Sequence, residues 1–336
     1  MSISQTKLAQ QLGVSRSAVS HVLNGREHMV GEETRERILA AIRESGYHKN
    51  ALVRALKANR TDIIGIIVPE TSMSFFNSII RGVEMEAQLN GLRCLLCQSY
   101  HEICTLEQHI SALREYRVDG LVIGPSSSNI DDRIFRTLQE HRVPFVLFDN
   151  PLENLKTAFV GTENVVAGRM AAEHLLELGH RKIACIKGYM DSEPARGRLQ
   201  GYLEAMDAAG IEVRPEWVLD GGFSFEDGVA AIDQLRSNQV DFSAVVAASD
   251  HVAFGAINAL VRHGLRVPQD VSVVGCGNLD LAGMFMPSLT TVDQDPLDVG
   301  RQALRLLVGQ IKKKKLSSKA ITIQPKLVCR DSTAPL

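Results

Sequence analysis

The chain has 336 residues, of which 45% are hydrophobic and 23% are charged, a composition suited to two or three compact globular units. No apolar run approaches the roughly 18 residues that a membrane span needs, and the first residues lack the charged-then-apolar layout of a signal peptide. We therefore expect a cytoplasmic protein that makes no membrane contact.

The net charge of −2 is distributed unevenly along the chain. Residues 1–60 contain ten Lys or Arg and five Asp or Glu, a net charge of +5, whereas residues 61–336 contain 27 and 34, a net charge of −7. Attraction to phosphates is the sequence-independent part of DNA binding. The asymmetry therefore predicts a DNA contact near the N-terminus.

Two short amphipathic helices are predicted at residues 7–12 and 16–23, with Gly13 at the tight turn between them and Ser15 as the N-cap of the second. The second helix turns Ala18, Val19, Val22 and Leu23 inward and leaves Arg16, Ser17, Ser20 and His21 on its outer face. A helix-turn-helix presents such a face to the major groove. The alternative is an ordinary helical hairpin whose polar face is merely solvated.

After residue 61, buried strands alternate with amphipathic helices in two series of similar size. The first series has strands at 63–68, 92–97, 120–123 and 145–148 and helices at 76–89, 106–116 and 133–140. The second has helices at 165–178, 196–209, 226–235 and 251–263 and strands at 183–186, 217–219, 244–247 and 271–274. A helix at 299–311 and strands at 320–323 and 327–329 complete the tail. The pattern predicts an α/β fold with two doubly wound lobes after an all-α helix-turn-helix domain.

The exact residues of the first domain identify its family more specifically than their hydrophobic periodicity does. Leu8-Ala-x-x-Leu-Gly-Val-Ser-Arg-x-x-Val-Ser-x-Val-Leu-Asn-Gly, followed by Glu33-Thr-Arg-Glu-Arg-Ile, closely resembles the lactose/purine repressor family. The resemblance implies a homodimeric repressor that binds a pseudo-palindromic operator under the control of a small-molecule effector. It also implies that Arg16, Ser17 and His21 read base edges, with Ser15, Ser20 and Asn24 near the DNA backbone.

The resemblance further implies a helix-turn-helix domain at 1–48 and a hinge helix and linker at 49–60. In the hinge, Leu56 matches the leucine that opens a base step from the minor groove, and Lys57 matches the basic residue beside it. The alternative is that Leu52 and Leu56 only form one packing stripe. The sequence Tyr47-His-Lys-Asn50 lacks the family's usual proline, which pre-sets the start of the helix.

Residues 61–336 resemble the sugar-binding fold that these repressors share with periplasmic binding proteins, through segments such as Leu178-Gly-His-Arg-Lys-Ile-Ala and Gly197-Arg-Leu-Gln-Gly-Tyr. The expected lobes are about 61–160 with 292–319, and about 161–291 with 320–336. In such folds the ligand lies at the carboxyl ends of the strands. The expected effector-binding residues are Phe75, Phe76, Ser126, Ser127, Asp149, Arg198, Phe223, Asp250 and Gln294. For each, core packing or helix capping is the alternative.

One departure concerns the effector. Members of the family usually have Gly-Tyr/Phe-Asp-Asp/Asn after a late strand, and the first Asp of this motif binds ligand hydroxyls. This chain has Gly275-Cys-Gly-Asn278 and lacks that carboxylate. Because Arg198 is retained, an anionic or modified sugar becomes a stronger candidate than a plain hexose. The residues leave open whether the effector is an inducer or a corepressor.

Rival readings are a periplasmic sugar-binding protein and an enzyme on a Rossmann-like sheet. The basic N-terminal segment argues against the first, and the lack of a phosphate loop or nucleophile elbow argues against the second. Cys94-Leu-Leu-Cys97 and the pair His174 and His180 have metal-like spacing but no further ligands nearby. We expect no enzyme activity, no cofactor and no metal site.

Overall fold

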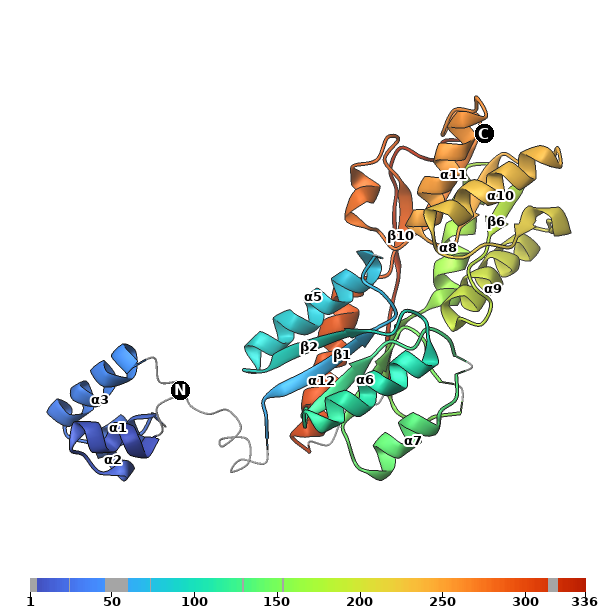
Figure 1. Cartoon of the computed structure of the whole chain (residues 1–336). Helices are drawn as coiled ribbons and strands as arrows, with labels where there is room; N and C mark the ends of the chain where they lie inside the picture. Colours follow the sequence, from blue (N-terminus) through green and yellow to red (C-terminus); the bar gives the residue numbers. More distant parts are fainter. Residues whose placement is uncertain are drawn as a thin grey trace. The chain divides into compact units, whose positions relative to one another are not determined.

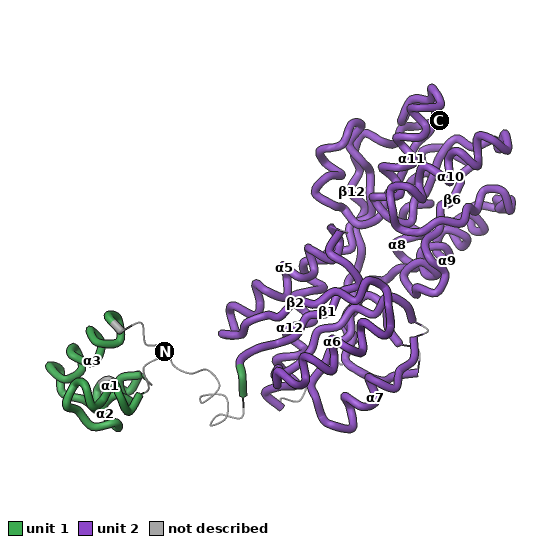
Figure 2. Tube along the Cα trace, in the orientation of Figure 1, with its two compact units in different colours: residues 1–61 green, residues 62–336 purple. Residues whose placement is uncertain are grey.

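The computed structural model describes residues 5–23, 25–45, 60–72, 74–128, 130–152, 154–313 and 320–336. The chain divides into two compact units, residues 1–61 and 62–336 (Figure 2). The first is all-helical and the second contains two β-sheets. The expected fold class, a helix-turn-helix unit followed by two doubly wound α/β lobes, is confirmed.

Helices from three parts of the first unit enclose a small apolar core. They are α1 (Gln5–Leu12), α2 (Arg16–Leu23) and α3 (Glu32–Ser45), with a short 3-10 helix, η1 (Glu27–Met29), between the last two. The buried core residues are Leu8, Ala9, Val19, Val22 and Ile38. Each helix contributes its apolar face to one cluster, because helical periodicity places its apolar side chains on one face and burying that face removes apolar surface from water.

The first lobe of the second unit is built on a six-stranded sheet with the order β11-β5-β4-β3-β1-β2. Its strands are β1 (Ile63–Val68), β2 (Arg93–Gln98), β3 (Gly120–Ile123), β4 (Phe145–Phe148), β5 (Ala158–Thr162) and β11 (Ala320–Ile323). Its helices are α5 (Ser74–Leu89), α6 (Ile103–Glu115), α7 (Arg133–Glu140) and α12 (Pro296–Ile311). Helices α5 and α12 cover one face of the sheet, and α6 and α7 cover the other.

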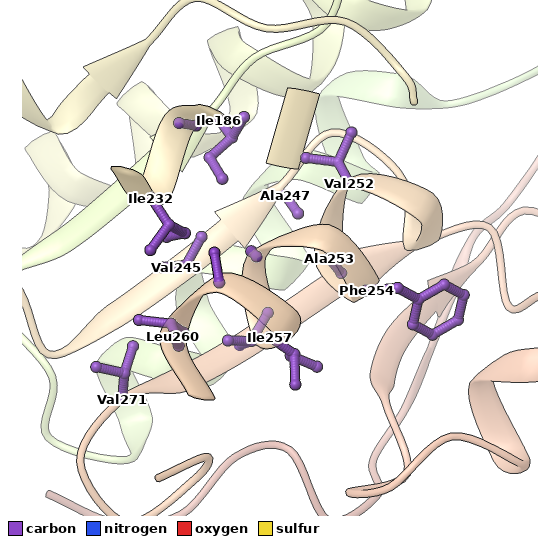
Figure 3. Close-up of a cluster of buried hydrophobic side chains, with 14 of the residues drawn as sticks. Ile186, Ile232, Val245, Ala247, Val252, Ala253, Phe254, Ile257, Leu260 and Val271 are labelled. Atoms are coloured by element: carbon purple, nitrogen blue, oxygen red, sulfur yellow. The ribbon is translucent and has the colours of Figure 1, made fainter. Parts of the chain in front are cut away.

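The second lobe repeats this plan with a sheet in the order β12-β10-β9-β8-β6-β7. Its strands are β6 (Ile183–Ile186), β7 (Val218–Leu219), β8 (Ala244–Ala247), β9 (Ser272–Cys276), β10 (Thr290–Asp293) and β12 (Lys326–Val328). Its helices are α8 (Asn164–Glu177), α9 (Glu193–Ala208), α10 (Phe225–Ser237) and α11 (Asp250–Arg262), with 3-10 helices η2 (Pro215–Trp217) and η3 (Asp280–Gly283). Figure 3 shows the cluster between this sheet and helices α10 and α11, where Ile232, Val245 and Ile257 meet.

The chain passes between the two sheets after β5, after β10 and after β11 (Figure 1). The sequence predicts neither β5 nor β10, the strands at two of these crossings. It also places residues 320–336 together in the second lobe. The structure instead pairs β11 with β5 in the first sheet, and β12 with β10 in the second. The local sequence of a short tail strand does not indicate which strand it pairs with, because strand pairing here joins residues far apart in sequence.

Candidate functional site

Helix α2 packs one face on the core of the first unit and follows a tight turn from α1. Val19 and Val22 are buried, Ala18 and Leu23 pack against the same core, and Val14 packs there from the turn. Gly13 has a φ of 63°, a left-handed conformation that allows the tight turn between α1 and α2. The Ser15 hydroxyl accepts a hydrogen bond from the Ala18 backbone N–H at 3.1 Å, which is an N-cap.

The face of α2 away from the core carries the residues expected to contact DNA. Arg16 and Ser17 are exposed, while Ser20 and His21 are half-buried. The Ser15 and Ser17 hydroxyls lie 2.9 Å apart. Asn24, Leu56 and Lys57, which the resemblance also assigns to DNA binding, lie outside the described residues.

The second unit holds a cavity whose walls come from both lobes. Eight of the nine expected effector-binding residues line it: Phe75, Phe76, Ser126, Asp149, Arg198, Phe223, Asp250 and Gln294. Most of them follow the carboxyl ends of strands or begin the next helix. Crossover topology places such positions at one edge of each sheet, so the two edges together line one cleft.

Arg198, on α9, lines this cleft and contacts three other lining residues. Its Nη1 donates to Gln294 Oε1 at 3.2 Å and to Cys276 Sγ at 3.4 Å, and its guanidinium carbon lies 5.5 Å from the centre of the Phe223 ring. The Arg198 Nε–H is buried and has no hydrogen-bond partner among the described residues. A buried donor without a partner costs stability unless a ligand accepts from it.

Two carboxyl groups share the cleft with this guanidinium. Burial raises the pKa of Asp149 to about 6, against the opposing effect of Arg198. Burial likewise raises the pKa of Asp250 to about 6, although hydrogen bonds from Thr291 and Leu279 stabilise its charged form. The Leu279 N–H donates to Asp250 Oδ2 at 2.7 Å, and the Thr291 hydroxyl donates to Oδ1.

Aromatic rings form the apolar walls. The Phe75 and Phe76 rings meet edge-on with centroids 5.5 Å apart, and Phe76 meets Phe148 at 6.4 Å. Phe76 is buried in the first lobe, so it supports the core as well as lining the cavity. On the opposite lobe, the rings of Phe223 and Tyr189 pack edge-on at 5.7 Å.

Ser127 does not line the cleft. Its hydroxyl donates to the Asp191 carbonyl oxygen at 3.0 Å, and the neighbouring Ser128 N–H donates to the same oxygen at 3.1 Å. These bonds join the first lobe to the loop before α9. Sequence spacing places Ser126 and Ser127 at the same strand end but does not show which of them faces the other lobe.

Several lining residues are not among the expected effector-binding residues. The position of Gly277 is discussed in the sequence for its missing carboxylate, whereas the others are missed: Pro69, His101, Asn150, Tyr189, Ser192, Pro194, Ser249, His251, Cys276 and Leu279. Each lies within two or three residues of a strand end or helix start, which is the signal that could have found it. Asn150 is the most connected: its Oδ1 accepts from the Ser128 and Ser192 hydroxyls and from the Glu193 N–H.

Gly277 adopts a φ of 136°, which side-chain-bearing residues rarely adopt. A Cβ built there would lie 3.6 Å from Asp250 Oδ2. The family's usual carboxylate at this position would therefore lie close to that of Asp250. In this chain the cleft keeps one carboxylate here, on α11, instead of two.

The other candidate ligand groups have structural partners. His180 is buried and lies within hydrogen-bond distance of the Ser243 and Ser272 hydroxyls, and His174 bonds Thr333. Cys94 and Cys97 pack against opposite faces of the first sheet. Within the described ranges, no three His, Cys, Asp or Glu side chains gather closely enough to hold a metal ion. None of the helices described there combines the length and apolarity needed for a membrane crossing.

Comparison with known proteins identifies the family. A model of bacterial regulatory proteins of the lacI family matches residues 7–50, and a model of the periplasmic binding protein-like domain matches residues 172–333. The HTH-type transcriptional repressor PurR of Serratia proteamaculans is 36% identical over 329 residues, covering 97% of this chain and 96% of that protein. The chain belongs to the lacI family. PurR of Vibrio vulnificus is also similar, at 34% identity over 97% of both chains.

Solved structures of lacI-family regulators share the whole fold. The lac repressor dimer bound to operator and the anti-inducer ONPF has a TM-score of 0.89 and 25% identity, covering 99% of this chain and 100% of that one. A complex of the regulator CelR with cellobiose has a TM-score of 0.76 and 33% identity, covering 98% and 99%. This lacI-family protein is therefore a DNA-binding transcriptional repressor with an effector-binding domain, and not an enzyme.

Proposed function

We propose that this lacI-family repressor binds a pseudo-palindromic operator as a homodimer, and that a neutral, sugar-like effector in the cleft controls its operator affinity. The charged groups of the cleft are the observation that favours a neutral effector over an anionic one. One guanidinium, Arg198, lies among two carboxyls of raised pKa, Asp149 and Asp250, and Glu193 is close enough to raise the pKa of Asp149 further.

An anionic effector would add negative charge to a cleft where burial already disfavours it. A polyol suits the same groups better, because a hydroxyl both donates and accepts. Its oxygens can accept hydrogen bonds from the Arg198 guanidinium, and its hydroxyl groups can donate hydrogen bonds to Asp149. The neighbouring structures of CelR with cellobiose and of an Enterococcus faecium regulator with ribose contain neutral sugars. We therefore rank a neutral sugar above the anionic ligand that the sequence suggests through the missing carboxylate at Gly277.

A ligand in the cleft can control DNA binding because residues of both lobes line the cleft. Phe75, Phe76 and Asp149 belong to the first lobe, whereas Arg198 and Phe223 belong to the second. A ligand held by both lobes binds more tightly to one lobe arrangement than to another, and only that difference can shift operator affinity.

On the DNA side, Arg16, Ser17 and His21 are the proposed base-reading residues, and Ser15, Ser20 and Asn24 the proposed backbone contacts. The exposure of Arg16 and Ser17 on α2 supports this assignment. For Leu56 and Lys57 the support is the family resemblance alone, which assigns them to the minor groove.

Exposed apolar side chains support a homodimer. On the first lobe they are Met85, Leu89, Leu95 and Leu96, from α5 and the edge strand β2; on the second they are Leu281, Met284 and Met286. Leu89 is 80% exposed and Met286 is 88% exposed. Large apolar groups gathered on a surface indicate a protein contact, and a second copy would place two recognition helices on two half-sites.

Fluorescence anisotropy with the chain's own upstream DNA tests this proposal. We expect binding to a palindromic segment, one dimer per site, that survives a random-duplex competitor and weakens with salt. Neutral sugars are then added one at a time. A sugar that weakens operator binding is an inducer, and one that strengthens it is a corepressor. If binding shows no sequence preference with or without any sugar, the proposal is wrong.

A further inference from the structure

A second cavity adjoins the effector cleft and opens to solvent. We call it the outer chamber and the first cavity the inner cleft. Five residues line both: His101, Ser126, Tyr189, Phe223 and His251. The rest of the outer chamber is lined by Glu70, Ser72, Asp191, Ser224, Phe225 and Glu226. The two cavities therefore adjoin along these five shared residues.

Tyr189 is the main aromatic surface of the outer chamber. Its side chain is 52% exposed, although its ring packs edge-on against Phe223. Burial and the nearby Asp227, Glu70 and Asp191 raise the pKa of its phenol, so the hydroxyl stays protonated and can donate. A large aromatic ring left half-open beside carboxylates offers a surface for the C–H face of a sugar ring and acceptors for its hydroxyls.

The charge of the outer chamber restricts what can bind there. Among the described residues that line it are three carboxylates, Glu70, Asp191 and Glu226, and no lysine or arginine. The imidazole of His101 lies 3.4 Å from a Glu70 oxygen, and burial lowers the pKa of His251. A phosphate or carboxylate on the ligand would meet like charge here, whereas hydroxyl groups would meet acceptors.

The walls of the outer chamber come from both lobes. Glu70 and Ser72 follow β1 and His101 follows β2 in the first lobe, while Tyr189 follows β6 and Glu226 lies in α10 of the second. An occupant that contacts both walls adds to the differential binding that shifts the lobe arrangement.

We infer that the effector is a neutral two-unit glycoside, with one ring in the inner cleft against Arg198 and a second ring in the outer chamber against Tyr189. The inference rests on the proposed function for the inner ring and adds the length and charge of the ligand. It excludes a sugar phosphate whose phosphate lies in the outer chamber.

Calorimetric titration of the full-length chain tests the inference. The probes are glucose, galactose, mannose and xylose, their α- and β-linked disaccharides, and glucose 6-phosphate. We expect at least one disaccharide to bind about tenfold or more tightly than its component monosaccharides. Tyr189→Ala should remove most of that gain, weakening disaccharide binding more than monosaccharide binding. Tyr116→Ala, at an exposed tyrosine outside both cavities, is the matched control and should change neither affinity.

Three results would overturn the inference: no disaccharide binds, a monosaccharide binds as tightly as every disaccharide that contains it, or Tyr189→Ala weakens both kinds of ligand equally. The proposed function is tested separately, by measuring operator binding with fluorescence anisotropy. A monosaccharide that alone shifts operator affinity by the full amount would retain the proposed function and remove the second ring. Loss of sequence-specific operator binding would remove the proposed function itself.

Discussion

The backbone of Gly168, on α8, lies directly against Arg198, on α9. A Cβ added to Gly168 would lie 1.9 Å from the Arg198 carbonyl oxygen. Gly201, one turn further along α9, makes the reciprocal contact, with an added Cβ 2.0 Å from the Val165 carbonyl oxygen. The position of the cleft's guanidinium is therefore set by close packing of two helix backbones, which glycine alone allows.

Gly168→Ala should push α9 away from α8 and displace Arg198. We expect the effector unit to lose about 1–3 kcal/mol of unfolding free energy, because the clash is with backbone. Effector affinity should fall as well. Urea denaturation and calorimetry measure the two effects. Gly283→Ala, where the added Cβ meets only Arg330 Nε at 3.9 Å, is the control. Equal stability of the two variants would show that α8 and α9 can separate without cost.

Arg198→Lys should weaken effector binding by roughly 10- to 100-fold, because an ammonium cannot reproduce the guanidinium's fixed fork of donors. Operator affinity without effector should stay near that of the wild type. Calorimetry and operator anisotropy measure these quantities. Arg196→Lys, on the same helix but outside the cleft, where Arg196 Nη1 donates to the Met190 carbonyl oxygen, is the matched control. Unchanged effector affinity in Arg198→Lys would remove this residue from the proposed site.

The free energy of unfolding should depend on pH through Asp250. Its pKa is about 6 in the folded chain, above the value near 4 of an unfolded aspartate. The folded state therefore binds more protons between these values, so this stabilising contribution is lost as pH rises through about 6. From pH 4 to 7, the wild type should lose roughly 1–3 kcal/mol relative to Asp250→Asn.

Denaturation curves at several pH values measure this difference. Asp280→Asn, at an exposed carboxyl, is the control and should follow the wild type. If Asp250→Asn and the wild type changed in parallel across the range, Asp250 would not titrate near pH 6 in the folded chain.

Leu89→Asp should dissociate the proposed homodimer, because it places a charge on an apolar side chain that is 80% exposed in the single chain. Sedimentation velocity should show monomers at concentrations where the wild type is dimeric, and operator affinity should fall steeply. Val261→Asp, at another exposed apolar residue, on α11, is the control. Dimers that persist in Leu89→Asp would rule out this face of α5 as the contact.

Leu56→Ala should weaken specific operator binding while most salt-sensitive, non-specific binding remains, since removing a minor-groove wedge leaves phosphate contacts intact. Anisotropy with operator and random duplexes at two salt concentrations measures both. Leu52→Ala is the comparison: a loss shared equally by the two variants would favour the packing stripe over the wedge.

The sequence is sufficient for the fold class because its periodic segments are long. It misses β5 because the apolar run there, Ala158-Phe-Val, is only three residues long and ends at Gly161. It misses β10 because that strand is not an apolar run: it begins with Thr290 and Thr291, whose buried hydroxyls find partners. The Thr290 hydroxyl donates to the Arg330 carbonyl oxygen and that of Thr291 to Asp250. Such partners come from distant parts of the chain, so local patterning cannot indicate burial.

The cleft is predicted unevenly for a similar reason. Residues that lie in the helices after strands, such as Phe76 on α5 and Arg198 on α9, can be listed from topology and resemblance, and the structure brings them together. Which neighbour faces the cleft depends on the other lobe: Ser126 lines it, while Ser127 bonds Asp191. The outer chamber depends on Tyr189, which lies in a loop whose sequence has no distinguishing pattern.

Reciprocal linkage tests the central claim, that a ligand between the lobes controls DNA binding, most directly. Operator affinity is measured with and without saturating effector, and effector affinity with and without operator. We predict that both ratios are equal, as thermodynamic coupling between two sites on one molecule requires, and that Arg198→Lys reduces the apparent effector affinity in both measurements. An effector that binds the cleft while leaving operator affinity unchanged would contradict the account.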